Sequence, residues 1–336
     1  MGDLLSVVVP CFNEESVLPA THARLQKALG ALGMPWEVLY IDDGSRDRTR
    51  EILLALATAD ERVKVISFSR NFGHQIAVTA GLNHARGSAV VIIDADLQDP
   101  PEVIGRMVEK WREGYDVAYG LRTERAGESR FKRWTAQLFY RLINKLSDVS
   151  IPLDVGDFRL LSRRAVDAFN AMPECDRFIR GMVAWAGFRQ VAVPYARDKR
   201  YAGESKYPLR KMIRFALDGI ISFSDAPARF ATTVGFVSLS IAALVSLQVF
   251  VAYFFARDTV PGWTSTFLAI TFLGGVQSLC IGILGEYIAR IYREVKRRPL
   301  YLVAATANLP DPVASCRSPD DPATSARRGP GDGTRS

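Results

Sequence analysis

Two carboxylates two residues apart, Asp94 and Asp96, directly follow an apolar run at residues 89–93, and the amide of Gln98 comes two residues later. Carboxylate and amide oxygens are hard ligands that suit Mg²⁺ or Mn²⁺. A cation held there would neutralise the charge that develops as a nucleotide diphosphate leaves. A lone DxD is common in surface turns, but its place at the end of an apolar strand makes this one more specific. The stretch predicts metal-assisted transfer from a nucleotide-activated donor.

Two further polar motifs each follow an apolar run. Residues 10–15 (PCFNEE) come after the first run, and residues 42–45 (DDGS) after the second. Their carboxylates are suited to accept hydrogen bonds from a uracil N–H or from ribose hydroxyls. Asn13 and Ser45 are equally suited to cap the helices that follow, and the two roles are compatible. The chain has no GxGxxG after its first strand and no GxxxxGK[ST], which disfavours a dinucleotide dehydrogenase or a P-loop enzyme.

The elements that must position these motifs alternate between strand and helix over the first hundred residues. Apolar runs predict strands at residues 5–9, 37–41, 63–68 and 89–93, and helical spacing predicts helices at 14–32, 47–59 and 75–85. Further strands are predicted at 116–119 and 190–194, and helices at 132–146 and 163–171. The alternation indicates an α/β, doubly wound and mostly parallel sheet. Such sheets bind ligands at the carboxyl ends of their strands, where all three motifs fall.

Two long uncharged runs, residues 231–256 and 261–285, come later in the chain. Each is long enough to cross the roughly 30 Å hydrocarbon core of a membrane, and the short connector between them predicts a hairpin. Both outer flanks are basic, which places the N-terminal part and the C-terminus in the cytoplasm. Residues 206–224 are basic and amphipathic, which favours a helix in the membrane interface over an ordinary surface helix.

The chain therefore divides into five parts. These are a cytoplasmic catalytic domain (1–205), an amphipathic juxtamembrane helix (206–229), transmembrane helices at 230–257 and 262–292, and a basic flank with a disordered cytoplasmic tail (293–336). The net charge of +7 gathers around the two spans, which disfavours a nucleic-acid partner. The four cysteines are scattered, which excludes a disulfide framework or a zinc site of the usual spacing.

Taken together, the motifs resemble family 2 glycosyltransferases, which have the GT-A (Rossmann-like) fold. Within the family the chain is similar to the polyprenyl-phosphate branch, which includes dolichol-phosphate-mannose synthases and bacterial undecaprenyl-phosphate glucosyltransferases. The resemblance spans about residues 4 to 300 and is carried by residues 10–15, 42–45, 71–73 (NFG), 94–101 (DADLQDPP), 200–207 (RYAGESKY) and 284–292. It implies an integral protein of a bacterial-type inner membrane. The QxxRW signature of the processive members is missing, which argues for transfer of a single sugar.

The resemblance also implies roles for individual residues. The nucleotide is expected to contact Pro10, Asn13, Glu15, Asp43 and Asp94. Mg²⁺ or Mn²⁺ is expected to bind Asp94, Asp96 and Gln98. The expected catalytic residues are Asp96 and Asp157, the latter as a base, as an orienting group, or in a structural pair with Arg159. The phosphates and the acceptor are expected to contact Arg122, Arg133, Arg200, Ser205 and Lys206.

The implied reaction is inverting transfer of one sugar from a nucleotide sugar to undecaprenyl phosphate. UDP-glucose is the favoured donor. A UDP-aminopentose, UDP-N-acetylglucosamine and GDP-mannose remain alternative donors, and an inactive membrane scaffold is the alternative from another class. Two spans are too few for a flippase, so a separate protein is expected to carry the product across. The sequence leaves the oligomeric state open, a homo-oligomer included.

Overall fold

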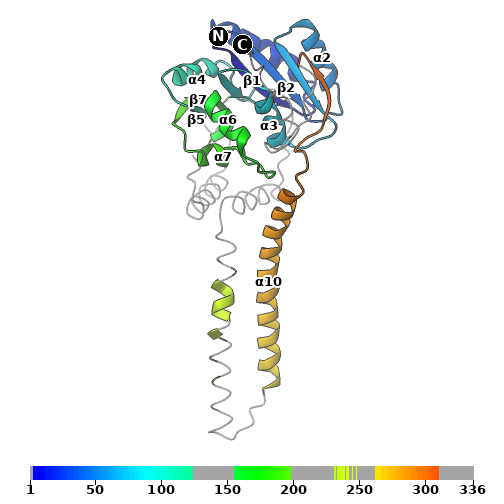
Figure 1. Ribbon diagram of the computed structural model, residues 1–336, viewed down its shortest axis with the longest axis vertical. Helices are drawn as coiled ribbons and strands as arrows, with labels where there is room; N and C mark the ends of the chain where they lie inside the picture. The colour runs from blue at the N-terminus through cyan, green and yellow to red at the C-terminus, as the bar shows by residue number, and fades with distance from the viewer. Residues whose placement is uncertain are drawn as a thin grey trace, which may run out of the picture.

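A computed structural model of the chain describes residues 3–123, 155–197, parts of 231–247, and 262–309. A single sheet with helices on both faces forms a globular part, from which helix α10 (Trp263–Val295) extends as a long stalk (Figure 1). The predicted helix at 132–146, the juxtamembrane helix at 206–229 and the tail beyond residue 309 lie outside the described residues, as does much of the first predicted span.

In the part of the chain that the structure describes, the sheet has eight strands in the order β7-β5-β6-β4-β1-β2-β3-β8. Their bounds are β1 Leu5–Cys11, β2 Trp36–Asp42, β3 Val63–Phe68, β4 Ala89–Ile92, β5 Val117–Arg122, β6 Val155–Ser162, β7 Gln190–Tyr195 and β8 Val303–Ala307. Strand β1 is parallel to β2 and β4, β2 is parallel to β3, and β5 is parallel to β7. Strand β6 runs antiparallel to β4 and β5, and β8 antiparallel to β3. The α/β prediction is confirmed: the sheet is mixed, with β6 and β8 running opposite to the direction that the other described strands share.

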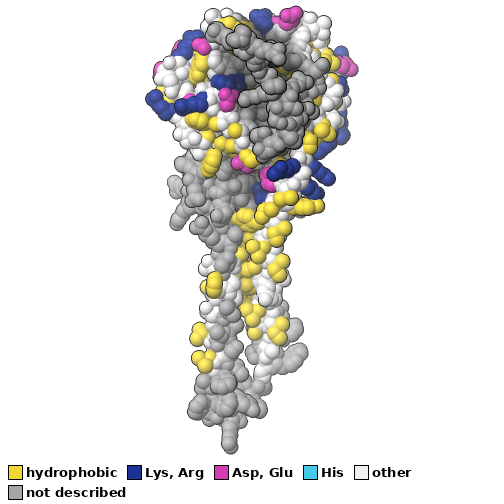
Figure 2. All heavy atoms as spheres, viewed as in Figure 1, with side chains coloured by type: hydrophobic (Ala, Val, Ile, Leu, Met, Phe, Trp, Pro, Cys, Tyr) yellow, Lys and Arg dark blue, Asp and Glu magenta, His cyan; other side chains and the backbone are white. Residues whose placement is uncertain are grey.

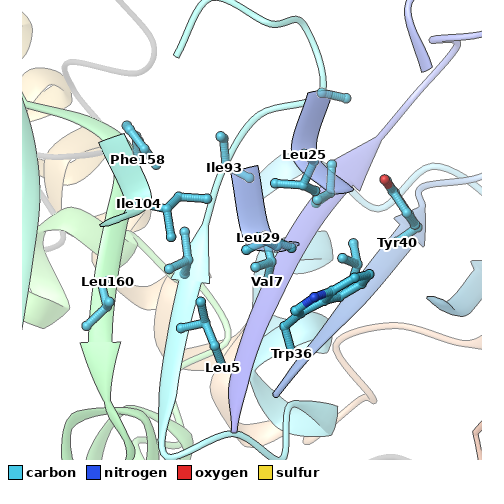
Figure 3. Close-up of a cluster of buried hydrophobic side chains, with 14 of the residues drawn as sticks. Leu5, Val7, Leu25, Leu29, Trp36, Tyr40, Ile93, Ile104, Phe158 and Leu160 are labelled. Atoms are coloured by element: carbon cyan, nitrogen blue, oxygen red, sulfur yellow. The ribbon is translucent and has the colours of Figure 1, made fainter. Parts of the chain in front are cut away.

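Among the described residues, six shorter helices cover the two faces of the sheet. They are α1 (Leu18–Gly30), α2 (Thr49–Ala59), α3 (His74–His84), α4 (Val103–Arg112), α6 (Arg163–Ala171) and α7 (Ile179–Trp185). Successive strand residues face opposite layers: Val7 packs with Leu29 and Ile104 on one face (Figure 3), whereas Val8 joins Val78 on the other. Burial of both faces explains why these strands read as continuous apolar runs.

Helix α10 is the one described element that is long and apolar enough to cross a membrane. Residues Phe272–Val295 form a 24-residue candidate span with a mean hydropathy of 1.4, none of it buried. Apolar side chains line the stalk in Figure 2. The helix continues to Val295, three residues past the predicted end of the second span. Most of the first helix of the predicted hairpin lies outside the described ranges.

Within the predicted basic flank and tail (293–336), residues 303–307 form β8 at the edge of the sheet, a strand that the sequence pattern does not predict. Before this strand, Tyr301 is 1 % exposed and stacks on Phe68, with ring centroids 5.0 Å apart. After it, the Asn308 side-chain amide donates to backbone oxygens of Ala57 and Val63. The small residues of β8 show little apolar patterning, because an edge strand is held mainly by backbone hydrogen bonds to its neighbour.

Candidate active site

The three polar motifs meet at one edge of the sheet. Strands β1, β2 and β4 are parallel, so the residues that follow them lie at the same edge. Strand β5 has the same direction, because two antiparallel steps through β6 restore it, and β6 begins where β5 ends. This edge therefore gathers the residues after β1, β2, β4 and β5 together with the first residues of β6, among them Asp157.

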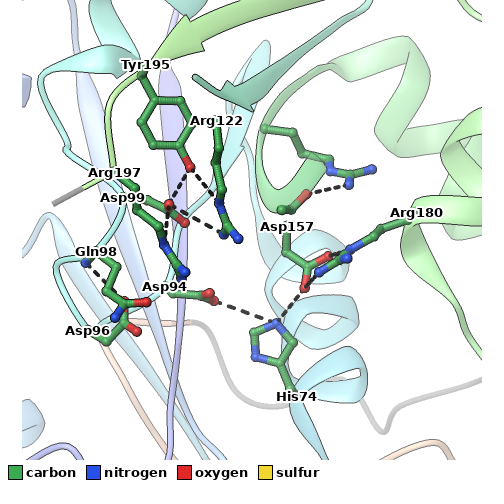
Figure 4. A network of polar contacts seen from close by, with 12 residues as sticks. His74, Asp94, Asp96, Gln98, Asp99, Arg122, Asp157, Arg180, Tyr195 and Arg197 are labelled. Atoms are coloured by element: carbon green, nitrogen blue, oxygen red, sulfur yellow. Dashed lines mark hydrogen bonds and ion pairs between the residues drawn. The ribbon is translucent and has the colours of Figure 1, made fainter. Parts of the chain in front are cut away.

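Asp157 lies at the centre of a polar network (Figure 4). The residue is 8 % exposed, and its carboxylate accepts two hydrogen bonds from Arg180, from Nε at 2.8 Å and Nη2 at 3.2 Å. His74, the first residue of α3, places its Nε2 3.3 Å from Asp157 Oδ2 and 3.7 Å from Asp94 Oδ1. One imidazole thus connects the acid of β6 to the first acid of the DxD stretch.

The charges of this network set the protonation of its members. Burial alone would raise the pKa of Asp157, but the hydrogen bond from His74 and the charge of Arg180 hold it well below its ordinary value. Burial raises the pKa of Asp94 to about 6, with His74 opposing the shift and Asp157 adding to it. Burial would lower the pKa of His74, but Asp157 and Asp94 raise it to about 9. The imidazole is therefore a cation between two carboxylates.

A second cluster surrounds Asp99, which is 1 % exposed. Tyr195, the last residue of β7, donates its hydroxyl hydrogen to Asp99 Oδ1. The Arg122 Nη2 and Arg197 Nε atoms lie 3.7 Å and 3.8 Å from the same oxygen, and Arg122 Nε donates to the Tyr195 hydroxyl at 3.3 Å. Asp99 therefore positions two guanidinium groups beside the DxD stretch (Figure 4).

The DxD stretch fits a divalent cation. Within the described ranges no three His, Cys, Asp or Glu side chains already converge as a metal-binding group. Asp94 Oδ1, however, is inaccessible to solvent and accepts no hydrogen bond from the described part of the chain. His74 is a cationic neighbour of this oxygen at 3.7 Å, but the negative charges of Asp157, Asp99 and Asp96 oppose it, so a further cation would stabilise the buried carboxylate. Mg²⁺ is commonly held by one or two carboxylates together with substrate phosphates, so the small number of protein ligands suits it.

Comparison with known proteins identifies the family. The model of "Glycosyl transferase family 2" matches residues 6–169. An uncharacterized glycosyltransferase of Bacillus subtilis is 48% identical over 298 residues, which cover 89% of this chain and 92% of the relative. The chain belongs to glycosyltransferase family 2. A bactoprenol glucosyl transferase of Shigella phage SfII is 44% identical over 299 residues, which cover 89% of this chain and 97% of the relative.

Among solved structures, the chain is similar to glucosyl-3-phosphoglycerate synthase from Mycobacterium tuberculosis. That structure is a complex with Mn²⁺, uridine diphosphate and glucosyl-3-phosphoglycerate, and the match covers 64% of this chain and 77% of the synthase chain. The sequence identity is 21% and the TM-score 0.45. The α/β fold with a mixed sheet described above is the GT-A-like arrangement expected of a family 2 glycosyltransferase.

In this family 2 chain, most of the residues that are predicted to contact the nucleotide form hydrogen bonds to neighbouring loops. Asn13 Oδ1 accepts from Arg46 N at 2.8 Å, and Glu15 Oε2 from Arg48 N at 3.0 Å, which join the loops after β1 and β2. The Asp43 carboxylate accepts from Phe72 N and Gly73 N, at 2.7 Å and 2.9 Å, and so fixes the residues just before His74. Pro10 lies inside β1, where it pairs with Ile41. These contacts shape the edge on which a ligand would lie.

The structure brings together Asp94, Asp96, Gln98, Arg122 and Asp157 at this edge (Figure 4). The predicted phosphate contacts Arg133, Arg200, Ser205 and Lys206 lie outside the described residues. Asp157 does not form the alternative pair with Arg159. Its carboxylate binds Arg180 and His74. The Arg159 guanidinium instead donates to Gly156 O at 3.0 Å.

Sequence reasoning assigned no role to His74, Asp99, Arg180, Tyr195 or Arg197. Asp99 lies inside the DADLQDPP stretch and His74 directly follows the NFG motif, so their positions next to these motifs could have indicated both residues. Arg180, Tyr195 and Arg197 carry no local signal, because their neighbours in the site lie far away along the chain.

Proposed function

We propose that this family 2 glycosyltransferase moves one glucose from UDP-glucose to bactoprenol (undecaprenyl) phosphate with inversion of the anomeric centre. The observation that carries the proposal is the pair Asp94 and Asp96 beside Asp157, at the sheet edge to which Arg122 and Arg197 bring positive charge. The glucosyl group and the bactoprenol acceptor are suggested by the names of relatives, bactoprenol glucosyl transferase and its homolog, at 42% to 44% identity.

In this mechanism a phosphate oxygen of the lipid attacks the anomeric carbon of glucose. The bond from that carbon to the UDP oxygen breaks, and its electron pair leaves with the diphosphate. A divalent cation bound by Asp94, Asp96 and Gln98 would neutralise the diphosphate. Because a phosphate monoester is already anionic near neutral pH, the attack needs little help from a base.

Asp157 is accordingly proposed as an orienting residue rather than a base. Its pKa is held well below the ordinary value, and its two oxygens already accept hydrogen bonds from Arg180, so it is a weak proton acceptor. It would present Arg180 and His74 to the sugar or the acceptor. Arg122, together with Arg133, Arg200, Ser205 and Lys206, is proposed to bind the phosphates.

The membrane supplies the acceptor. We place the catalytic part in the cytoplasm, with residues 206–229 in the interface and a two-helix anchor whose second helix is α10. The candidate span Phe272–Val295, with its exposed apolar surface, supports this arrangement. The product would then leave through a separate flippase, and a homo-oligomer is compatible with this topology.

The proposal is tested with purified full-length protein, Mg²⁺ or Mn²⁺, bactoprenyl phosphate, and a panel of radiolabelled nucleotide sugars. We expect label in the organic phase from UDP-glucose, abolished by EDTA and reduced about a thousandfold or more by Asp96→Ala. Label only from a UDP-aminopentose, UDP-N-acetylglucosamine or GDP-mannose would show that the enzyme transfers that sugar instead of glucose. A folded protein that binds no nucleotide and transfers no label would instead be the inactive scaffold.

A further inference from the structure

The loop between α6 and α7 joins the end of the membrane helix to the candidate active site. Glu294 Oε1 accepts a hydrogen bond from Cys175 N at 2.7 Å. Next to it, Arg293 Nη2 lies 2.6 Å from Asp176 Oδ2, and Arg290 Nη1 lies 3.6 Å from the same oxygen. We call this set of contacts between the last turns of α10 and residues 175–176 the α10 latch. Basic and acidic side chains gather at this level of the molecule in Figure 2.

The same loop leads directly into the residue that binds Asp157. Only a few residues separate Asp176 from Arg180, whose Nε and Nη2 atoms donate to the two oxygens of Asp157. The start of α7 is also fixed from the side of α3, because Ile179 N donates to Gln75 Oε1 at 3.0 Å. Arg180 is therefore placed by the latch on one side and by the neighbour of His74 on the other.

The loop has little freedom to absorb a shift of α10. Arg177 Nε donates to Glu174 O at 3.1 Å, and its guanidinium lies 4.9 Å from the ring centroid of the buried Phe169. The Arg180–Asp157 pair is bidentate, which fixes the direction of the guanidinium as well as its distance from the carboxylate. A displacement at Asp176 is thus passed to the Arg180–Asp157 pair rather than lost in the loop.

We propose that the α10 latch positions Arg180, and through it Asp157, so that the seating of the membrane helix sets the geometry of transfer. Arg293 and Asp176 act as positioning residues, and this inference rests on the proposed glycosyl transfer. The arrangement gives full turnover only while α10 is seated against the catalytic part, where the lipid acceptor is also presented.

The test uses the full-length protein in lipid nanodiscs with UDP-glucose and bactoprenyl phosphate. For Arg293→Ala we expect kcat to fall about three- to tenfold, because small misplacements of a catalytic group are costly. The Kd for UDP should stay within about twofold of wild type, and Arg293→Lys should restore most of kcat. Arg298→Ala is the matched control: it removes the same charge from the same flank, and within the described ranges Arg298 is exposed and forms no ion pair.

A double-mutant cycle separates positioning from a general effect of charge at the membrane. In an Arg180→Lys background, Arg293→Ala should lower kcat no further. Asp176→Asn, a change on the exposed loop side of the latch, gives a second cycle if Arg293→Ala weakens folding. Equal kcat for Arg293→Ala and Arg298→Ala, or full additivity in both cycles, would overturn the latch. A wild-type protein that transfers no sugar would instead overturn the proposed function.

Discussion

Gly156, the residue before Asp157, leaves room for the Arg122 guanidinium. A β-carbon at this position would lie 2.6 Å from Arg122 Nη2, at the far end of a flexible side chain. Gly156→Ala should therefore displace Arg122 from Asp99 and Tyr195 without unfolding the sheet. We expect the KM for bactoprenyl phosphate to rise about tenfold, because a lost charge-assisted contact to phosphate is worth about 1.5 kcal/mol or more.

The control for this change is Gly105→Ala in α4. A β-carbon there meets only Leu32 Cδ2 at 3.4 Å, so neither KM nor kcat should change. An unchanged KM for Gly156→Ala would show that the Arg122 position is irrelevant to acceptor binding. A large loss of thermal stability with it would point to a packing role for the glycine.

Glu37 provides a residue-scale prediction on pH. It is 4 % exposed within β2 and accepts hydrogen bonds from Ser6 Oγ, Lys64 Nζ and Arg86 N. Burial alone would raise the pKa of Glu37, but these hydrogen bonds, that of Lys64 foremost, lower it. The stability it contributes is therefore present above its unfolded pKa of about 4.3 and is lost as pH falls through the lower folded value.

For Glu37→Gln we expect the free energy of unfolding to fall by about 2 to 4 kcal/mol at pH 7, because Lys64 loses its partner. The difference from wild type should shrink below about pH 4. Unfolding in detergent from pH 7 to pH 3 measures both. Glu51→Gln removes an exposed pair with Arg48 and should cost less than about 0.5 kcal/mol. A difference that grows on acidification would contradict the assignment.

At the scale of elements, β8 depends on Asn308. Its side-chain amide donates to Ala57 O at 2.5 Å, Val63 O at 2.9 Å and Asp60 O at 3.3 Å, and its φ is 56°. Asn308→Ala loses these hydrogen bonds and adds backbone strain, so we expect it to cost about 2 to 3 kcal/mol in the free energy of unfolding. Asn308→Gly keeps the backbone conformation and should cost about 1 kcal/mol less.

Thermal or denaturant unfolding of the two variants separates the strain from the hydrogen bonds. Equal stability of Asn308→Ala and wild type would mean that β8 is held by its pairing with β3 alone. Aggregation of both variants would indicate that the edge of β3 becomes accessible once β8 detaches.

Elements with a strong local pattern could be predicted from the sequence. Strand β3 and helix α6 were predicted at the residues where the structure has them, and the other predicted elements among the described residues agree to within a few residues. Helix α4 was missed although Val103, Ile104, Met107 and Val108 have helical spacing and are buried. Helix α7 has only seven residues, too few for a periodic signal, and β8 finds its partner at β3, far away in the sequence.

The candidate site divides in the same way. The DxD stretch and Asp157 could be predicted, because short motifs mark them. The Arg180–Asp157 pair could not, because it depends on the antiparallel entry of β6 and on the loop before α7. Local pattern predicts which residues carry chemistry, whereas long-range packing decides which of them meet.

At the scale of the whole molecule, α10 connects the candidate site to the proposed membrane anchor. The 33 residues of α10 would span about 50 Å at 1.5 Å per residue, more than the roughly 30 Å hydrocarbon core. Its last turns contact residues 175–176, at the sheet edge that carries Asp94 and Asp157. The candidate site and the end of the candidate span therefore lie at the same edge of the sheet, the edge from which the stalk extends (Figure 1).

The edge position of β8 bears on how the protein is made. Strand β3 is synthesised early, but the strand that closes its open side follows α10 near the end of the chain. At about 5 to 20 residues per second, the roughly 230 residues between them take roughly ten to fifty seconds to translate. If α10 is the membrane anchor proposed above, it enters the bilayer before the sheet is closed. A ribosome that stalls after α10 would leave an inserted enzyme with an unpaired strand, a form that cellular proteases can distinguish from the finished product.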